Sequence, residues 1–201
     1  MALNFANNNS LSAITSLPAT VSGGVFNLIS TQTASSSATI DFTSGIDSTY
    51  NEYVFKFYNI HPSGDGSNGV FRFQGDTGTN TNYNQTITST YFIAYHNENG
   101  SEQALGYSAS EDQAQGTAFQ YLGSGDNQSD SGISGYLHLF NPSSTTFVKH
   151  FIGQTINDPS SYAQVEYIAG YFNTTTAITR VQFKMASGNI DSGVIKLYGI
   201  S

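Results

Sequence analysis

Apolar and polar residues alternate through much of this chain, most clearly toward its C-terminal end. In the segment RVQFKM (180–185), Val, Phe and Met occupy every second position, and Arg, Gln and Lys lie between them. A period of two directs one set of side chains to a core and the other to water, as in a half-buried β-strand. No window long enough for a helix shows a convincing period of 3.6 residues. The pattern therefore predicts an all-β protein.

The pattern predicts a series of short strands separated by turn-forming residues. Ser-Gly, Asn-Gly, Gly-Asp-Gly and Asn-Pro sequences mark the turns between them. The predicted strands are Val25–Ser30, Ala38–Phe42, Glu52–Ile60, Val70–Gln74, Thr86–Tyr95, Thr117–Leu122, Gly135–Phe140, Thr146–Gln154, Gln164–Phe172, Ala177–Met185 and Gly193–Tyr198. Strands at this spacing favour an antiparallel β-sandwich, jelly-roll-like in its organisation. Two hairpins are also predicted, one joining 52–60 to 70–74 and the other joining 164–172 to 177–185.

The first 24 residues differ in composition from the rest of the chain. They are rich in Asn, Ser, Ala and Thr, and breaks at Pro18 and at Gly23-Gly24 separate them from the first predicted strand. We interpret 1–24 as an N-terminal docking arm and 25–201 as a single β-sandwich domain. The sparse apolar anchors of this assembly arm are Leu3, Phe5, Leu11, Ile14 and Leu17. An ordinary edge segment lying on its own domain is the alternative.

Charge is scarce in this sequence and its balance is acidic. Charged residues make up 10% of the chain, and the net charge is −8, whereas soluble domains average about 25% charged residues. A surface poor in Lys and Glu suits packing against other copies or other proteins. The six basic residues are scattered, so the chain lacks the cationic stripe that nucleic acids or anionic membranes require. We expect no nucleic-acid partner and no membrane insertion.

Cysteine content and the start of the chain bear on where the protein is made. The sequence contains no Cys, so neither disulfides nor thiolate metal sites are expected. The beginning of the chain shows no basic segment followed by an apolar one, which a secretory signal would need. We therefore expect synthesis in the cytoplasm.

Gly64, Gly66 and Gly69 spell G-x-G-x-x-G, the pattern of a dinucleotide-binding loop. That loop must open a helix, whose N-terminus holds the phosphates. Here the segment leads into VFRFQ, another predicted strand. The glycines are therefore interpreted as loop residues, and no cofactor is expected.

Other candidate chemistry also has simpler explanations. His138 and His150 fall on neighbouring predicted strands, but their spacing matches no usual ligand set for a metal. The oxygen-rich loops around Asp65 and Asp126 suit calcium, but turn-forming side chains are the simpler explanation of both loops. The acidic residues between 98 and 112 lie in a polar stretch where solvated carboxylates are usual. We assign no catalytic and no metal-binding residues and expect no enzyme.

Several longer segments together resemble a known family. They are TIDFTSGID (39–47), EYVFKFYNIHP (52–62), YHNE (95–98), LHLFNPSSTTFVKHFIG (137–153), AGYFNTTTAITRVQFKMASGNIDSG (169–193) and the terminal IKLYGI. As a set, they resemble virion structural proteins of roughly 200 residues from tailed bacteriophages, especially marine phages and cyanophages. The resemblance covers nearly the whole chain. It implies a virion component and carries no catalytic or metal-binding residues.

The resulting functional expectation is a non-enzymatic virion structural protein on the particle exterior. We expect a fibre, spike or tail-associated module that forms a homo-oligomer, a trimer by expectation, with other virion proteins as partners. Its loops would contact a host surface glycan or protein. Tyrosines in polar loops offer rigid contact surfaces, and Tyr83, Tyr95, Tyr107 and Tyr121 are the candidates. Packing within the strands or core is the alternative for each of them.

Two other functions remain open from the sequence. One is capsid decoration, in which the arm and one sheet face clamp capsid subunits as a cement protein does. The other is a carbohydrate-binding lectin or glycan-active enzyme built on a jelly roll.

Overall fold

All regular structure in the described part of the chain is β-strand. The computed structural model describes residues 25–159 and 161–201. The strands are β1 (Phe26–Ser37), β2 (Ile40–Phe42), β3 (Glu52–Pro62), β4 (Val70–Thr77), β5 (Ile87–Asn97), β6 (Gln103–Tyr107), β7 (Ala114–Gly116), β8 (Gln120–Ser124), β9 (Ile133–Phe140), β10 (Lys149–Asn157), β11 (Tyr162–Phe172), β12 (Ile178–Met185) and β13 (Ile190–Ile200). The prediction of an all-β protein is confirmed. The arm residues Leu3, Phe5, Leu11, Ile14 and Leu17 lie outside the described residues. Within the described ranges, no helix is long and apolar enough to cross a membrane.

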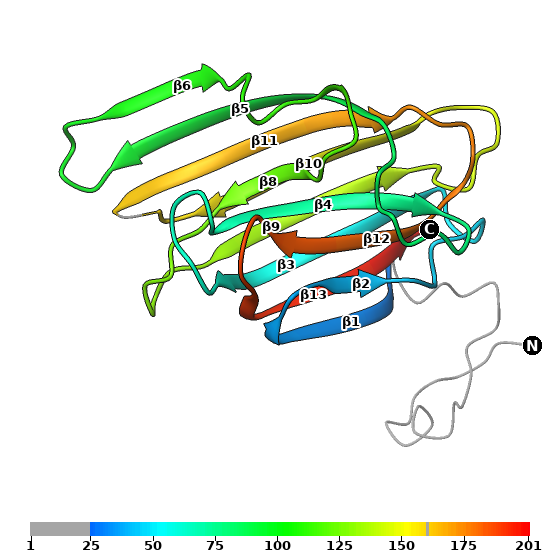
Figure 1. Cartoon of the computed structure of the whole chain (residues 1–201), viewed down its shortest axis with the longest axis horizontal. Helices are drawn as coiled ribbons and strands as arrows, with labels where there is room; N and C mark the ends of the chain where they lie inside the picture. Colours follow the sequence, from blue (N-terminus) through cyan, green and yellow to red (C-terminus); the bar gives the residue numbers. More distant parts are fainter. Residues whose placement is uncertain (1–24, 160) are drawn as a thin grey trace, which may run out of the picture.

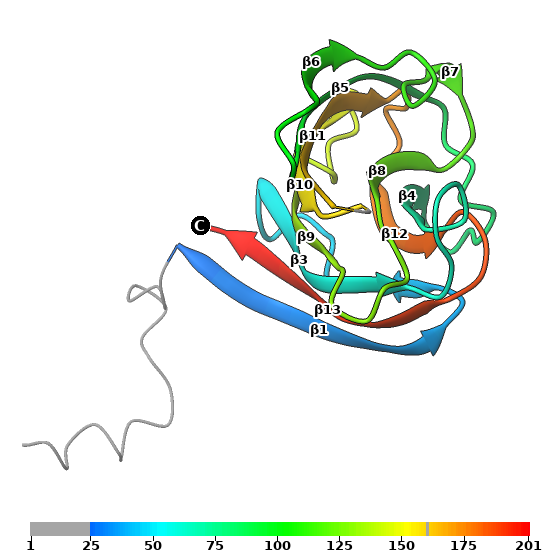
Figure 2. The same cartoon turned by 90° about the vertical axis from the view of Figure 1, so that its left-hand side faces the viewer.

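The strands form two antiparallel sheets that pack face to face. Within residues 25–159 and 161–201, a nine-stranded sheet has the order β1-β13-β3-β9-β10-β11-β5-β6, and β7 also pairs with β5. A four-stranded sheet has the order β2-β12-β4-β8. Figures 1 and 2 show the larger sheet curving around the smaller one. The predicted β-sandwich is therefore confirmed.

The chain crosses repeatedly between the two layers, as it does in a jelly roll. The first four strands alternate, with β1 and β3 in the large sheet and β2 and β4 in the small one. The two sheets are nevertheless unequal, whereas a jelly roll has two sheets of similar size.

Both hairpin predictions are wrong, because each predicted pair of strands lies in different sheets. β3 pairs with β13 and β9, whereas β4 pairs with β12 and β8. Likewise, β11 pairs with β10 and β5, whereas β12 pairs with β2 and β4. A period of two reveals which face of a strand is buried. It does not distinguish a turn within a sheet from a crossing between sheets.

The core between the sheets is built largely from phenylalanine. The alternation in segment 180–185 is confirmed, because Val181, Phe183 and Met185 are buried and the residues between them are half-buried. Phe183 lies at the centre of the aromatic cluster. Its ring centroid is 5.1 Å from that of Phe55, 5.4 Å from Phe57 and 5.7 Å from Phe71. These contacts join the small sheet to the large one.

Two strands were missed because their sequences lack an alternating burial signal. Every residue of β6 is exposed, and β7 spans only three residues. β1 extends to Ser37, well beyond the predicted end at Ser30, through Ser- and Thr-rich sequence. Strand pairing with β13 holds this segment extended. Residues 31–37 have too few apolar side chains for the end of β1 to be predicted.

Replacing Gly135 by Ala is expected to lower the free energy of unfolding by about 1–3 kcal/mol, the usual range for overpacking. A Cβ at this position would lie 2.1 Å from the Gln154 carbonyl oxygen and 2.8 Å from the Thr155 Cα. Both are backbone atoms of β10, so the two strands would have to separate. Gly106→Ala is the matched control, because a Cβ there meets nothing within 4 Å. Urea denaturation of both variants measures the difference, and equal effects would contradict this close approach.

Candidate functional site

A cleft of about 610 Å³ opens at one end of the sandwich. Here β5 and β11 of the large sheet extend past the small sheet (Figure 1). The inward-facing side chains at the projecting ends of β5 and β11 form one wall of the cleft. The strands β4 and β8 and their loops form the other wall. The volume lies within the range of about 300–1,000 Å³ that is usual for small-molecule sites.

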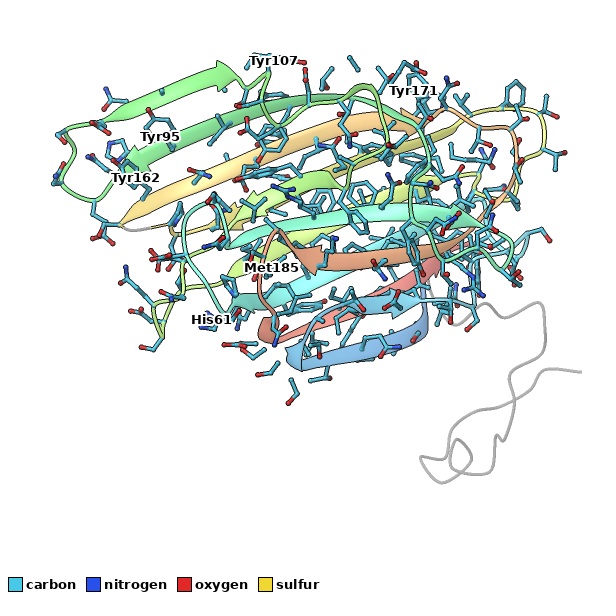
Figure 3. All side chains as sticks on the ribbon, viewed as in Figure 1. His61, Tyr95, Tyr107, Tyr162, Tyr171 and Met185 are labelled. Atoms are coloured by element: carbon cyan, nitrogen blue, oxygen red, sulfur yellow. The ribbon has the colours of Figure 1, made fainter. Side chains whose placement is uncertain are left out.

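Tyrosines from three strands line this cleft. Tyr95 of β5 and Tyr162 of β11 pack edge to face, with their ring centroids 5.7 Å apart. Figure 3 shows them side by side at this end of the large sheet. Tyr121 of β8 lies across the cleft and packs against the buried ring of Tyr91 at 5.1 Å. The Tyr91 contact holds the Tyr121 ring in place, and burial raises the pKa of the Tyr121 hydroxyl. The cleft therefore presents preformed aromatic surfaces.

Carboxylates and one guanidinium lie among these rings. Glu102, Glu111, Asp126 and Arg72 all line the cleft. The Tyr162 hydroxyl donates a hydrogen bond of 2.9 Å to Glu102 Oε2, and this bond raises the pKa of Tyr162. The carboxylate therefore has a fixed position at the rim.

Arg72 is positioned by its strand pairing, since it lies opposite Tyr121 in the β4–β8 register. Its Nε atom is buried and has no hydrogen-bond partner among the described residues. Nor does Arg72 form an ion pair within those residues. A buried N–H without a partner costs free energy unless a ligand or water accepts its hydrogen bond. The Arg72 guanidinium therefore lies in the cleft wall, with its Nε atom out of reach of solvent and of a bound molecule.

A buried polar network lies behind the cleft wall and is centred on Glu166. Its Oε1 accepts hydrogen bonds from the Ser124 amide at 3.1 Å and from the cleft residue Gln164 at 2.7 Å. Its Oε2 lies 2.7 Å from the Thr155 hydroxyl and 3.0 Å from Asn157 Nδ2. Burial raises the pKa of this carboxyl group, although the surrounding donors partly oppose the shift. The network holds the β8 wall of the cleft against β10 and β11.

Two acceptors compete for the single hydroxyl proton of Thr155, and this arrangement favours a protonated Glu166. Thr155 Oγ1 also lies 2.6 Å from the Leu122 carbonyl oxygen, which can only accept a hydrogen bond. The single hydroxyl proton of Thr155 is therefore directed to Leu122. The short contact with Glu166 Oε2 then requires Glu166 to supply the proton. A neutral carboxyl group is consistent with the raised pKa.

The structure divides the four tyrosines singled out in the sequence. Tyr95 and Tyr121 line the cleft. Tyr107 is exposed on β6, where its hydroxyl contacts Asp112. Tyr83 is buried, and burial raises its pKa to about 12. Its ring is therefore not available at the surface. The Tyr83 amide donates a 2.8 Å hydrogen bond to Asp76, and this bond holds the loop in place.

Sequence reasoning missed Tyr162 and Arg72. Tyr162 is the first residue of β11 and lies one residue before the alternating pattern becomes regular. Arg72 lies between Phe71 and Phe73, where the alternation predicts an ordinary solvent-exposed charge. The one available signal was that Tyr95 ends a predicted strand and that Tyr162 lies just before the predicted strand Gln164–Phe172. Their meeting depends on the β5–β11 register, which a single sequence does not specify.

The other sequence motifs lie apart from each other. Gly66 lines the cleft rim, and the G-x-G-x-x-G segment forms the loop between β3 and β4 as interpreted. His138 contacts Glu52 on β3, and His150 is exposed on β10 beside Tyr171. Within the described residues, no three His, Cys, Asp or Glu side chains gather as a group that could hold a metal ion.

A second cavity of about 610 Å³ lies beside the first and shares Tyr162 with it. It is more polar in character, and its groups bond to one another. The Asp158 carboxylate accepts hydrogen bonds from the Ser131 hydroxyl at 2.8 Å and from the Gly132 amide at 3.1 Å. His61 Nδ1 lies 3.0 Å from the Ser131 carbonyl oxygen. The tyrosine-lined cleft is therefore the stronger candidate site.

Comparison with known proteins adds no assignment, since no protein-family model and no curated protein matches this chain. The geometry of the cleft is therefore the main structural guide to its chemistry. Aromatic faces, carboxylate acceptors and a guanidinium donor are the groups that a polyhydroxylated ligand would contact.

Proposed function

We propose that this chain is a non-enzymatic structural protein on the exterior of a phage virion, associated with a fibre, spike or tail, that contacts a host surface glycan. The observation that carries the glycan contact is the convergence of Tyr95, Tyr121 and Tyr162 with Arg72 in one preformed cleft. The virion assignment rests on the sequence resemblance.

The chemistry of the cleft favours a neutral sugar. The C–H face of a sugar ring packs against an aromatic ring, and sugar hydroxyl groups donate to carboxylates such as Glu102 and Glu111. The guanidinium of Arg72, which lines the cleft, is the cationic donor for a sugar oxygen. An anionic sugar would meet three carboxylates for one guanidinium in a protein of net charge −8. Like charges at close range oppose binding.

Tyr95→Ala and Tyr162→Ala are each expected to weaken glycan binding at least tenfold, which corresponds to about 1.4 kcal/mol. Each change removes one aromatic face from the cleft. Tyr171→Ala is the matched control, because Tyr171 lies on β11 like Tyr162 but, nine residues further along, points to the opposite, outer face of the sheet. Binding of the purified full chain to immobilised neutral polysaccharides from a host envelope measures the effect.

The outcomes of this experiment separate the functions. Retention of binding in the two cleft variants, or an equal loss in Tyr171→Ala, would contradict the cleft as the site. A wild-type chain that binds no envelope polysaccharide would remove the adhesion function. Release of reducing ends from a bound polysaccharide would instead indicate a glycan-active enzyme.

Capsid decoration is the second candidate, and the outer face of the large sheet favours it. Ile152 and Ile156 of β10 and Phe92 of β5 are exposed there, with 47%, 59% and 41% of their surfaces accessible. An exposed apolar patch suits packing against another protein. The number of copies per particle distinguishes capsid decoration from a fibre or tail protein. Hundreds of copies indicate decoration, and a few to some tens indicate a fibre or tail.

A further inference from the structure

β6 ends the large sheet and leaves one edge without a strand partner among the described residues. All five residues of β6 are exposed, and its pairing with β5 is regular. Natural edge strands are commonly protected by Lys, by Pro or by a bulge, because an open edge pairs readily with another chain. The sequence QALGY has none of these features.

The hydrogen bonds flanking β6 fix the direction of its backbone groups. The Ser108 amide donates to the Tyr91 carbonyl and the Asn97 amide donates to the Glu102 carbonyl, each at 3.0 Å. Hydrogen-bonded and non-hydrogen-bonded pairs alternate along an antiparallel ladder. Ala104 and Gly106 therefore bond to β5. The N–H and C=O groups of Gln103, Leu105 and Tyr107 point to the open edge.

We propose that two copies of this chain pair edge to edge through β6, antiparallel, about a two-fold axis at Leu105. In this register Leu105 faces the partner subunit's Leu105, and Gln103 faces the partner subunit's Tyr107. Every open-edge N–H and C=O group then finds a counterpart, since such pairs exchange two hydrogen bonds. An interface that meets itself in this way closes as a symmetric dimer.

Charge supports a second copy as the occupant of this edge. Residues at the two-fold axis face their own copies, so a charge near Leu105 would meet an identical charge and oppose the pairing. The outward-facing positions of β10, β11, β5 and β6 carry no Asp, Glu, Lys or Arg, although the protein has a net charge of −8. Phe92 stacks on Tyr167 at 4.7 Å in this region, and Leu105, which lies opposite Ala94, is 73% exposed.

The interface is small, so the dimer belongs to the weak, concentration-dependent class. Many copies on one particle would raise the effective concentration and favour pairing. A two-fold contact of this kind gives a dimer instead of the trimer expected from the sequence.

Sedimentation velocity of the full chain over a concentration series tests the proposal. The wild-type chain should shift from monomer to dimer as its concentration rises toward the hundred-micromolar range. Leu105→Glu and Leu105→Lys should each remain monomeric, because identical charges would face each other across the axis. An equimolar mixture of these two variants should form a heterodimer. Leu105→Gln is the neutral control and should still dimerise through its backbone.

Leu105→Pro provides a second, independent test. It removes the open-edge N–H at the axis and leaves the bonds from Ala104 and Gly106 to β5 intact, so the fold should persist and the dimer should be lost. A wild-type chain that stays monomeric would overturn the proposal. So would an oligomer that survives Leu105→Glu, or a charge-swapped mixture that fails to associate. An unchanged thermal unfolding curve confirms that each variant is folded.

Discussion

Replacing Phe183 by Ala is expected to lower the free energy of unfolding by about 3–5 kcal/mol. Phe183 is fully buried between the two sheets, and its ring packs against those of Phe55, Phe57 and Phe71. Phe55 and Phe57 belong to the large sheet and Phe71 to the small one. Truncation would leave a cavity that neighbours from two rigid sheets cannot fill. The cost is a large part of the usual stability of about 5–15 kcal/mol.

Phe147→Ala is the matched control for this prediction. It removes the same side chain from a position that is 69% exposed, so the expected change is within about 0.5 kcal/mol. Chemical denaturation of both variants, analysed with a common dependence on denaturant, gives the two values. If Phe183→Ala cost no more than Phe147→Ala, the phenylalanine cluster would not be the core that joins the sheets.

The contribution of Glu166 to stability is expected to fall as the pH rises above 4.5, the ordinary pKa of its carboxyl group. Burial raises the pKa of Glu166 in the folded protein. Between the two pKa values, the folded chain binds one more proton at this site than the unfolded chain. The contribution of Glu166 is therefore fully present at low pH and is lost at about 1.4 kcal/mol per pH unit until the pH passes the folded pKa.

Glu166→Gln isolates this contribution from those of other titrating groups. Gln has nearly the same shape, stays neutral and can donate to Thr155 as the protonated carboxyl group does. It loses the hydrogen bond that Oε2 accepts from Asn157, but this loss does not depend on pH. The difference in unfolding free energy between the wild type and the variant should move in favour of Gln as the pH rises from 4 toward neutrality. Denaturation curves over a pH series give this difference. A difference that is constant with pH, or that moves in favour of Glu, would contradict a protonated Glu166.

The sequence predicted much of the secondary structure because burial repeats with a clear period in most strands. Segment 180–185 shows this best, since the alternation of Val181, Phe183 and Met185 matches their burial. The pairing of strands could not be predicted in the same way. The loops after β3 and β11 cross between layers, and their Gly-, Asn- and Thr-rich sequences suit either a hairpin or a crossing.

The candidate site was predictable only in part, because it depends on the register between distant strands. Tyr95 and Tyr121 were identified as surface tyrosines, and both line the cleft. Tyr83 has the same polar neighbours in sequence but is buried. Glu166 lies in the segment QVEYIAG, where its charge suggests exposure to solvent, yet its position in the alternation points inward. A charged residue at an inward position was the signal for the buried network.

The proposed place of this protein on a virion can be tested most directly by immunogold labelling of purified phage particles, using an antibody raised against this chain. Our account predicts gold on the tail or on projecting fibres. Gold spread over the head would contradict that placement and indicate capsid decoration. Particles that carry no gold would contradict the virion assignment itself.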